Sequence, residues 1–265
     1  MLNKQQVNIH FSRNAQYYDE YAVVQKQMAH NLIDMVKLAG EFRYILEIGC
    51  GTGFFTRLLA ELYPKAKIIA TDISEEMLKT AANNLRAFSN IEYRIEDGEQ
   101  LKLSGQFDLI VSNAAFQWFT DYQLAFKQFD NRLAAGGYLM YGTFGRDTFY
   151  ELDQSFKAAQ LSVGIPHRFY HGPRLIEIES LEHFGCELSH SVYLKDEHVK
   201  QNFASVKEFL RSVKKVGANN ANNSKSMIIN RQFMLSMINH YEKNFNHKGK
   251  VQATYHVIYG SHQKK

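Results

Sequence analysis

A glycine-rich loop is the first stretch of this sequence whose residue types could do chemistry. The segment LEIGCGTGFFT (46–56) places Gly49, Gly51 and Gly53 directly after an apolar run typical of a buried strand. Glycines there let the backbone turn tightly and approach a ligand closely, and the loop leads into a helix. The third glycine comes one residue too early for the dinucleotide-binding pattern G-x-G-x-x-G, and no phosphate-binding G-K-[S/T] occurs. The loop therefore predicts a ligand site but leaves the ligand open.

Acidic residues beside this loop narrow the choice of ligand. Glu47 precedes the loop and can accept a hydrogen bond from an amine, a group that a diphosphate lacks. Asp72 ends the next strand, where a carboxylate can accept both hydroxyls of a ribose. Asp97 ends the third strand and can accept from the exocyclic amine of adenine. A solvated strand end or a helix cap explains each acid taken alone, whereas the three together predict S-adenosylmethionine.

The elements that must position these residues alternate between strands and helices from residue 44 onward. Strands are expected at 44–48, 67–71, 91–95, 107–112 and 138–144. Helices are expected between them, at 55–63 and at 74–88, the second with Ser74 as its N-cap. This alternation indicates an α/β fold with a mostly parallel sheet that helices cover on both faces.

Over about residues 40–145, the E-x-G-C-G-T-G pattern resembles the class I S-adenosylmethionine-dependent methyltransferases. The resemblance implies a Rossmann-like, mostly parallel seven-stranded sheet and a role for each matching position. The three loop glycines would contact the methionine portion of the cofactor, and Asp72 would bind the ribose. The other matching residues are Ile73 and Met77 beside the adenine, Asp97 and Gly98 at its amine, and Asn113 near the methionine carboxylate. One departure, AAGG (134–137) in place of P-G-G, changes a turn and not the site.

A narrower resemblance extends nearly from end to end of the chain. The motifs that carry it are FSRNAQYYDEYAVVQ (11–25), SNAAFQWF (112–119), FGRDTFYEL (144–152), RSVKKVGA (211–218) and TYHVIYG (254–260). They resemble the malonyl-[acyl-carrier protein] O-methyltransferases of biotin biosynthesis. Related small-molecule methyltransferases share the first motif and the dipeptide QW, so RSVKKVGA and TYH carry most of the weight. The resemblance implies methylation of the free carboxylate of a malonyl thioester, with an acidic acyl-carrier protein as partner.

The chain is expected to divide into a core and two covering segments. The divisions are an N-terminal helical cover (1–40), a methyltransferase core (41–200), an inserted helical lid (201–248) and a last core strand (249–265). Because a helical pair inserted between late strands cannot join the sheet, it must pack over the crevice at the carboxyl ends of the strands.

Candidate substrate-binding residues come from the first lid helix, expected at 203–217. Arg211 and Lys214 share one face of it with Lys207 and Lys215. A surface helix with a solvated basic face explains this pattern. Under the functional alternative, Arg211 pairs with a substrate carboxylate and the lysines meet the acidic carrier. Trp118 either lines a substrate channel or belongs to the core.

The opening stretch FSRNAQYYDEYAVVQ is interpreted as a helix that covers the crevice. Phe11, Ala15, Tyr18 and Ala22 recur at helical spacing on one face. Tyr18 would point toward the methyl group and the substrate, as the candidate catalytic residue, and Gln25 toward the cofactor. The neighbouring tyrosines at 17 and 21 are expected to be packing residues.

Composition bounds the remaining alternatives. The net charge of +4 comes without a basic tract, so no nucleic-acid partner is expected. Cys50 and Cys186 form no metal-ligand spacing, and His167 and His171 are expected in a loop without a third ligand, so no metal is expected. Without a secretory signal or a membrane-spanning apolar run, the expected location is the cytoplasm. Rival functions are methylation of another small acid, a non-catalytic sensor of an adenosyl ligand and, disfavoured by Phe54, a nicotinamide oxidoreductase.

Overall fold

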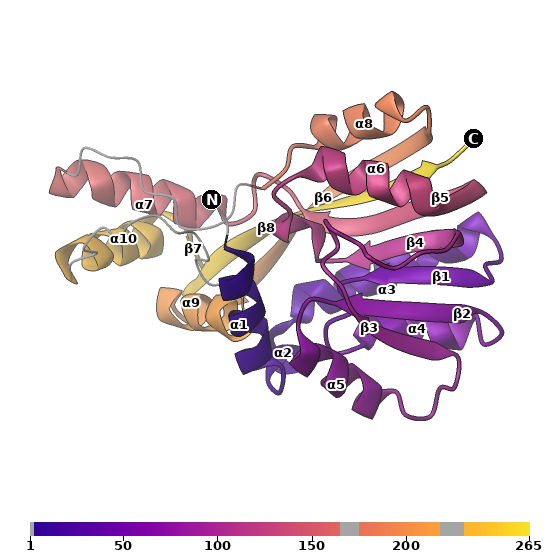
Figure 1. Cartoon of the computed structure of the whole chain (residues 1–265). Helices are drawn as coiled ribbons and strands as arrows, with labels where there is room; N and C mark the ends of the chain where they lie inside the picture. Colours follow the sequence, from indigo (N-terminus) through magenta and orange to yellow (C-terminus); the bar gives the residue numbers. More distant parts are fainter. Residues whose placement is uncertain (1–2, 165–174, 218–230) are drawn as a thin grey trace.

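A single twisted sheet forms the centre of the molecule (Figure 1). The computed structural model describes residues 3–164, 175–217 and 231–265. The sheet order is β3-β2-β1-β4-β5-β8-β6. The strands are β1 (Tyr44–Ile48), β2 (Lys67–Asp72), β3 (Ile91–Ile95), β4 (Phe107–Asn113), β5 (Leu133–Phe144), β6 (Ser191–Phe203) and β8 (Lys250–Gln263), and the two-residue β7 (Asn246–His247) pairs with β8.

The strand directions match the expected class I methyltransferase fold. Strands β3, β2, β1, β4 and β5 pair in parallel, and β8 runs antiparallel to both of its neighbours, β5 and β6. All five expected strands are present. Because the parallel strands share one direction, their carboxyl ends meet at one edge of the sheet, where ligands bind in open α/β folds.

Helices cover both faces of the sheet and bury two hydrophobic clusters. One cluster joins the sheet to α3 (Val23–Ala39) and α4 (Phe54–Leu62), and the other joins it to α6 (Tyr122–Arg132) and α8 (Ile178–Glu187). Helix α5 (Glu75–Asn84), which follows β2 in the chain, packs beside β2 and β3. Its expected cap is confirmed, since the Ser74 hydroxyl accepts a hydrogen bond from the backbone N–H of Met77 at 3.2 Å.

The expectation of one continuous helix across residues 11–25 is wrong. The structure divides the region into α1 (Lys4–Asn14), a single turn α2 (Tyr18–Tyr21) and α3, with a break at Ala22 (φ −80°, ψ 44°). Hydrogen bonds to the core explain the division. Asn8 donates a hydrogen bond to the backbone carbonyl of Ile73, and the hydroxyl of Ser12 is hydrogen-bonded to the hydroxyl of Ser74. These bonds fix α1 over the β2–α5 loop, so the chain must turn to reach α3.

Three helices form a separate layer beyond the carboxyl ends of the strands (Figure 1). They are α7 (Tyr150–Val163), α9 (Val206–Lys215) and α10 (Arg231–Asn244), and they share a buried apolar cluster that includes Phe156, Phe209 and Phe233. The expected lid at 201–248 contains α9 and α10 but omits α7, which packs along α10. The division at residue 200 therefore separates α7 from its packing partners. A single sequence did not reveal that pairing.

Candidate functional site

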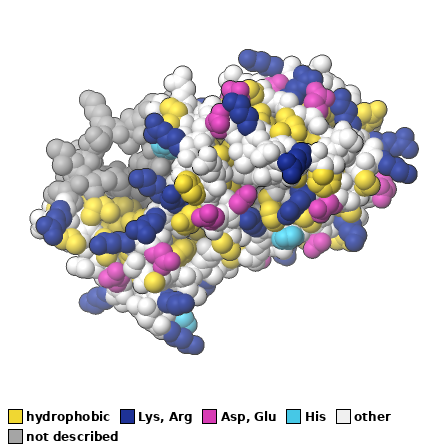
Figure 2. Space-filling view, turned by 90° about the horizontal axis from the view of Figure 1, so that it is seen from below, with side chains coloured by type: hydrophobic (Ala, Val, Ile, Leu, Met, Phe, Trp, Pro, Cys, Tyr) yellow, Lys and Arg dark blue, Asp and Glu magenta, His cyan; other side chains and the backbone are white. Residues whose placement is uncertain are grey.

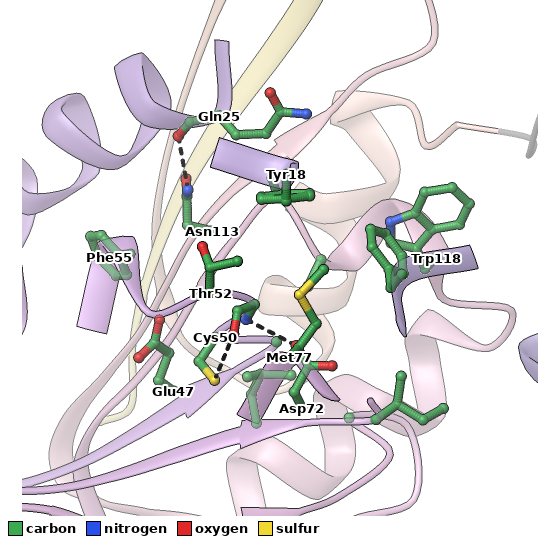
Figure 3. Close-up of a pocket in the computed structure, with 18 of the residues that line it drawn as sticks. Tyr18, Gln25, Glu47, Cys50, Thr52, Phe55, Asp72, Met77, Asn113 and Trp118 are labelled. Atoms are coloured by element: carbon green, nitrogen blue, oxygen red, sulfur yellow. Dashed lines mark hydrogen bonds between the residues drawn. The ribbon is translucent and has the colours of Figure 1, made fainter. Parts of the chain in front are cut away.

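An open pocket lies at the carboxyl ends of β1, β2 and β4, beneath α1, α2 and the start of α3 (Figure 3). Its empty space, including the part continuous with solvent, is about 990 Å³. Twelve of the residues singled out from the sequence line it. They are Tyr18, Gln25, Glu47, Gly49, Gly51, Asp72, Ile73, Met77, Asp97, Gly98, Asn113 and Trp118.

The glycine loop is built as expected, but its three glycines serve different purposes. All three have positive φ, which favours glycine. A Cβ on Gly51 would meet no atom within 4 Å, so this position is open to a ligand. A Cβ on Gly49 would come within 2.5 Å of Ala115. Gly53 does not line the pocket, and a Cβ there would come within 2.8 Å of Leu85, so this glycine permits close packing against the end of α5.

Asp72 is held rigidly at the end of β2. Its Oδ2 accepts from the backbone N–H of Gly51 at 2.9 Å, and its Oδ1 accepts from that of Ser74 at 2.8 Å. Burial raises the pKa of Asp72 to about 6, against the opposing effect of these backbone donors. Because a carboxylate oxygen can accept more than one hydrogen bond, capacity for ribose hydroxyls remains.

Glu47 is the most unusual ionisable group in the pocket. Its side chain is buried, its Oε2 has no hydrogen-bond partner in the described structure, and burial raises its pKa to about 8. The Oδ1 of Asn113 is likewise buried without a partner, while its Nδ2 donates to the backbone carbonyl of Gln25 at 3.0 Å. Buried polar atoms are normally satisfied, so a ligand carrying an amine fits beside Glu47.

The adenine end of the pocket contains an interaction that the sequence did not reveal. Lys4 Nζ lies 2.7 and 2.6 Å from the two carboxylate oxygens of Asp97 and 2.5 Å from Glu99. Lys4 itself lines the pocket. The neighbouring Gly98 is closely packed, since a Cβ there would come within 2.6 Å of Ile48. A ligand amine that reaches Asp97 must therefore share this carboxylate with Lys4.

One end of the pocket is aromatic. The Phe11 ring lies 6.3 Å from that of Tyr18 and 5.4 Å from that of Trp118, measured between centroids. Burial raises the pKa of Tyr18 well above its usual range, so its hydroxyl stays protonated. Phe11, Tyr18 and Ala22 all line the pocket, so the expected inward stripe meets the ligand site although the helix is interrupted.

Gln25 contacts its neighbour differently from the expectation. Figure 3 shows its backbone carbonyl directed at Asn113 while its side chain extends away from that contact. Thr52 and Asp19 also line the pocket, and neither was predicted from the sequence. The Thr52 hydroxyl donates a hydrogen bond to Asp19 at 2.9 Å and so ties α2 to the glycine loop. Their positions in the sequence could have indicated this, because Thr52 lies within the glycine loop and Asp19 follows Tyr18.

The structure does not bring Arg211 and Lys214 into the pocket. Both side chains are exposed on α9, which packs on α2, α10 and β6. Capture of a substrate carboxylate by Arg211 is therefore not supported, because packing of α9 turns its basic face to solvent. Figure 2 shows basic side chains interspersed with acidic ones on the face viewed from below.

One group among the described residues has the composition of a metal site. Asp147, His198 and His256 place their potential ligand atoms within 4.8 Å of one another. However, the two imidazole planes lie within 5° of parallel with centroids 4.6 Å apart. Since nitrogen lone pairs lie in the ring planes, one ion cannot meet both rings in this arrangement. His256 instead contacts Asp196 at 3.1 Å, as expected of a structural histidine. The two histidines at 167 and 171 lie outside the described residues.

Within the described ranges, none of the helices combines the length and the apolar character required to cross a membrane.

The strand order, the glycine loop and the acids at the strand ends define a class I methyltransferase. Residues 45–137 match the family described as a methyltransferase domain. The N-methyltransferase NodS of Bradyrhizobium japonicum, solved with S-adenosyl-L-homocysteine, covers 98% of this chain and 98% of its own, with a TM-score of 0.53 at 16% identity. This likeness shows the fold.

Full-length relatives are more specific. The malonyl-[acyl-carrier protein] O-methyltransferase of Acetivibrio thermocellus is 38% identical, over 100% of this chain and 95% of its own length. The protein of the same name from Bacillus cereus is 36% identical, over 98% of this chain and 97% of its own. The chain belongs to the malonyl-[acyl-carrier protein] O-methyltransferase family.

S-adenosylmethionine is the cofactor of this enzyme. The residues present fit it, because Glu47 and Asn113 offer unpartnered buried acceptors, Gly51 leaves open space, and Asp72 stands at the strand end.

Proposed function

We propose that this enzyme methylates the free carboxylate of a malonyl group carried by acyl-carrier protein and thereby forms a methyl ester. The observation that carries this proposal is the end-to-end identity of 38% with an enzyme of that name. The ester would serve an early step of biotin synthesis, in which a neutral chain end suits enzymes that elongate apolar acyl chains.

The methylation of a carboxylate requires no proton transfer by the protein. A carboxylate is already ionised near neutral pH, so the attacking oxygen needs no general base. When bound, S-adenosylmethionine supplies a methyl group on a positively charged sulfur. The task of the chain is then to align the reacting groups and exclude water, and alignment can lower a barrier by up to about 7–11 kcal/mol.

The site residues divide this task. Glu47, Asp72, Asp97 and Asn113 would hold the cofactor, with the loop backbone at Gly49 and Gly51 against its methionine portion. Ile73, Met77 and Gly98 would flank the adenine, and Gln25 would close the methionine end. Helices α1–α3 would form the cover, and α7, α9 and α10 the lid. The exposed basic face of α9, with Arg211 and Lys214, would meet the acidic carrier.

The direct test is mass spectrometry of the acyl carrier after incubation of the purified protein with S-adenosylmethionine and malonyl-carrier. A gain of one methyl group on the malonyl moiety supports the proposal, and no ester would overturn it. Malonyl-CoA and free dicarboxylic acids, assayed in parallel, identify a methyltransferase of another small acid. Rescue of a biotin auxotroph that lacks its own methyltransferase tests the biological role.

A further inference from the structure

The indole N–H of Trp118 is an unused hydrogen-bond donor in the pocket. Its Nε1 is buried and has no partner in the described structure, although the ring lines the pocket. Buried donors without a partner are rare in native proteins, and each calls for an explanation. Figure 3 places Trp118 and Tyr18 at the same end of the pocket, with the nitrogen-bearing side of the indole turned toward Tyr18.

Tyr18 supplies a second donor at this end. No hydrogen bond of its hydroxyl to another described residue is found, and both Tyr18 and Trp118 pack on the Phe11 ring. Burial keeps the phenol protonated by raising its pKa. A protonated phenol can donate, and an indole can only donate, so the two groups together suit an acceptor such as an oxygen anion.

Cations are scarce here. Among the described residues that line the pocket, Lys4 and Lys26 are the basic ones. Lys4 is paired with Asp97 and Glu99. Lys26 donates to the backbone carbonyl of Asp19 at 2.7 Å. Lys215 lies nearby, with its Nζ 4.3 Å from the ring centroid of Tyr17, but it does not line the pocket. The hydrogen-bond donors that line the aromatic end are therefore uncharged.

We propose that the Trp118 indole N–H and the Tyr18 hydroxyl together bind the carboxylate of the substrate, as a pair of uncharged donors. This inference rests on the proposed function. In the transfer, a lone pair of the carboxylate oxygen forms the new C–O bond to the methyl carbon, the S–C bonding pair goes to sulfur, and no proton moves.

The absence of charge on the donors has a kinetic purpose. The negative charge of the carboxylate declines as the new bond forms. A cation paired with it would therefore stabilise the reactant more than the transition state and raise the barrier. Uncharged donors still fix the direction from which the carboxylate oxygen attacks. Compared with a cation, they lose less of their interaction with the carboxylate as its negative charge declines in the transition state. The pair also selects acyl groups that end in a carboxylate.

The test compares Trp118→Phe and Tyr18→Phe with Tyr17→Phe, a matched control whose side chain is exposed and outside the pocket. With wild type shown to form the ester, we expect kcat/KM for malonyl-carrier to fall roughly 10- to 100-fold in each pocket variant. The control should match wild type. Affinity for S-adenosylhomocysteine and the melting temperature, measured on every variant, should stay close to wild type if the pocket remains folded.

A binding measurement separates donation from packing. Trp118 is the only tryptophan of the chain, so its emission reports on this end of the pocket. With S-adenosylhomocysteine bound, a malonyl thioester should shift the emission, and an acetyl thioester, which lacks the distal carboxylate, should not. Calorimetry should show that Trp118→Phe loses the preference for malonyl over acetyl. If the wild type is active, either of two results would overturn the inference. One is an equal emission response to the malonyl and acetyl thioesters, and the other is an unchanged preference of Trp118→Phe for malonyl over acetyl. An inactive wild type would instead overturn the proposed function.

Discussion

At the scale of single residues, the pocket concentrates acidic groups that are costly without a ligand. Glu47 is buried beside the glycine loop with one carboxylate oxygen unpartnered, and its pKa rises to about 8. Near neutral pH the ligand-free carboxyl is therefore largely protonated. An ammonium group favours the ionised form, so cofactor binding should release a proton from this side chain.

This coupling predicts the pH dependence of cofactor binding. Affinity for S-adenosylhomocysteine should increase between pH 6 and pH 8 in wild type, because ionisation of Glu47 costs less as the pH approaches its pKa. Glu47→Gln should bind roughly 10- to 100-fold more weakly at pH 8 and lose most of this pH dependence. Calorimetric titration at several pH values checks both. Wild-type affinity that does not vary with pH would contradict the assignment.

The raised pKa of Glu47 also predicts that Glu47→Gln stabilises the ligand-free protein at high pH. Its pKa is about 4.5 in the unfolded chain and about 8 in the ligand-free fold, so its stabilising effect is complete below pH 4.5 and is lost as the pH rises toward 8. Ligand-free Glu47→Gln should therefore melt higher than wild type at pH 8, by roughly 2–4 °C for each kcal/mol recovered, and by less at pH 6. Glu61→Gln, at an exposed position on α4, is the control.

At the scale of elements, α1 is attached to the core by polar contacts over the adenine end. Lys4 pairs with Asp97 and the buried Glu99, and Asn8 and Ser12 bond the β2–α5 loop. Because Lys4, Val7 and Phe11 of this helix line the pocket, these contacts hold one wall of the pocket in place.

Removal of the Lys4 contact should loosen α1. We expect Lys4→Met to lower the free energy of unfolding by about 1 kcal/mol, since it leaves two carboxylates without their cation. Amide hydrogen exchange should increase over residues 4–14 and remain unchanged in the central strands. Lys79→Met, which removes a fully exposed ion-pair partner on α5, should change neither measurement appreciably. Equal protection of α1 in the Lys4 variant would show that its apolar contacts suffice.

At the scale of the whole molecule, the helical layer stands beyond the sheet (Figure 1). The basic side chains Arg211 and Lys214 of α9 are exposed. Arg211 and Lys214 lie there outside the pocket, where they can act on a partner protein and not on the transferred group. Charged rims chiefly accelerate association, and salt screens them.

Carrier docking on α9 predicts a selective effect on KM. Arg211→Ala combined with Lys214→Ala should raise KM for malonyl-carrier several-fold, while leaving the parameters for a small malonyl thioester near wild type. The effect should shrink as ionic strength rises. Arg86→Ala combined with Lys65→Ala, exposed near the opposite end of the sheet, is the matched control. Steady-state kinetics with both substrates would contradict docking on α9 if the two double variants behave alike.

The sequence by itself determined the sheet, the glycine loop and the acids at the strand ends. Local residue types specify these features, and parallel strands bring their carboxyl ends together without further information. Glu47, Asp72 and Asp97 could therefore be assigned to one site from their positions alone.

Only the tertiary structure decided which side chains share the pocket across long separations. Lys4 meets Asp97 over 93 positions, α7 packs with α10, and Arg211 turns away from the site, although its residue type suited the role. No periodicity or spacing encodes these contacts, because they follow from how helices dock on one another. The direction of the Trp118 N–H toward Tyr18 is of the same kind, since it depends on ring orientation within the folded pocket.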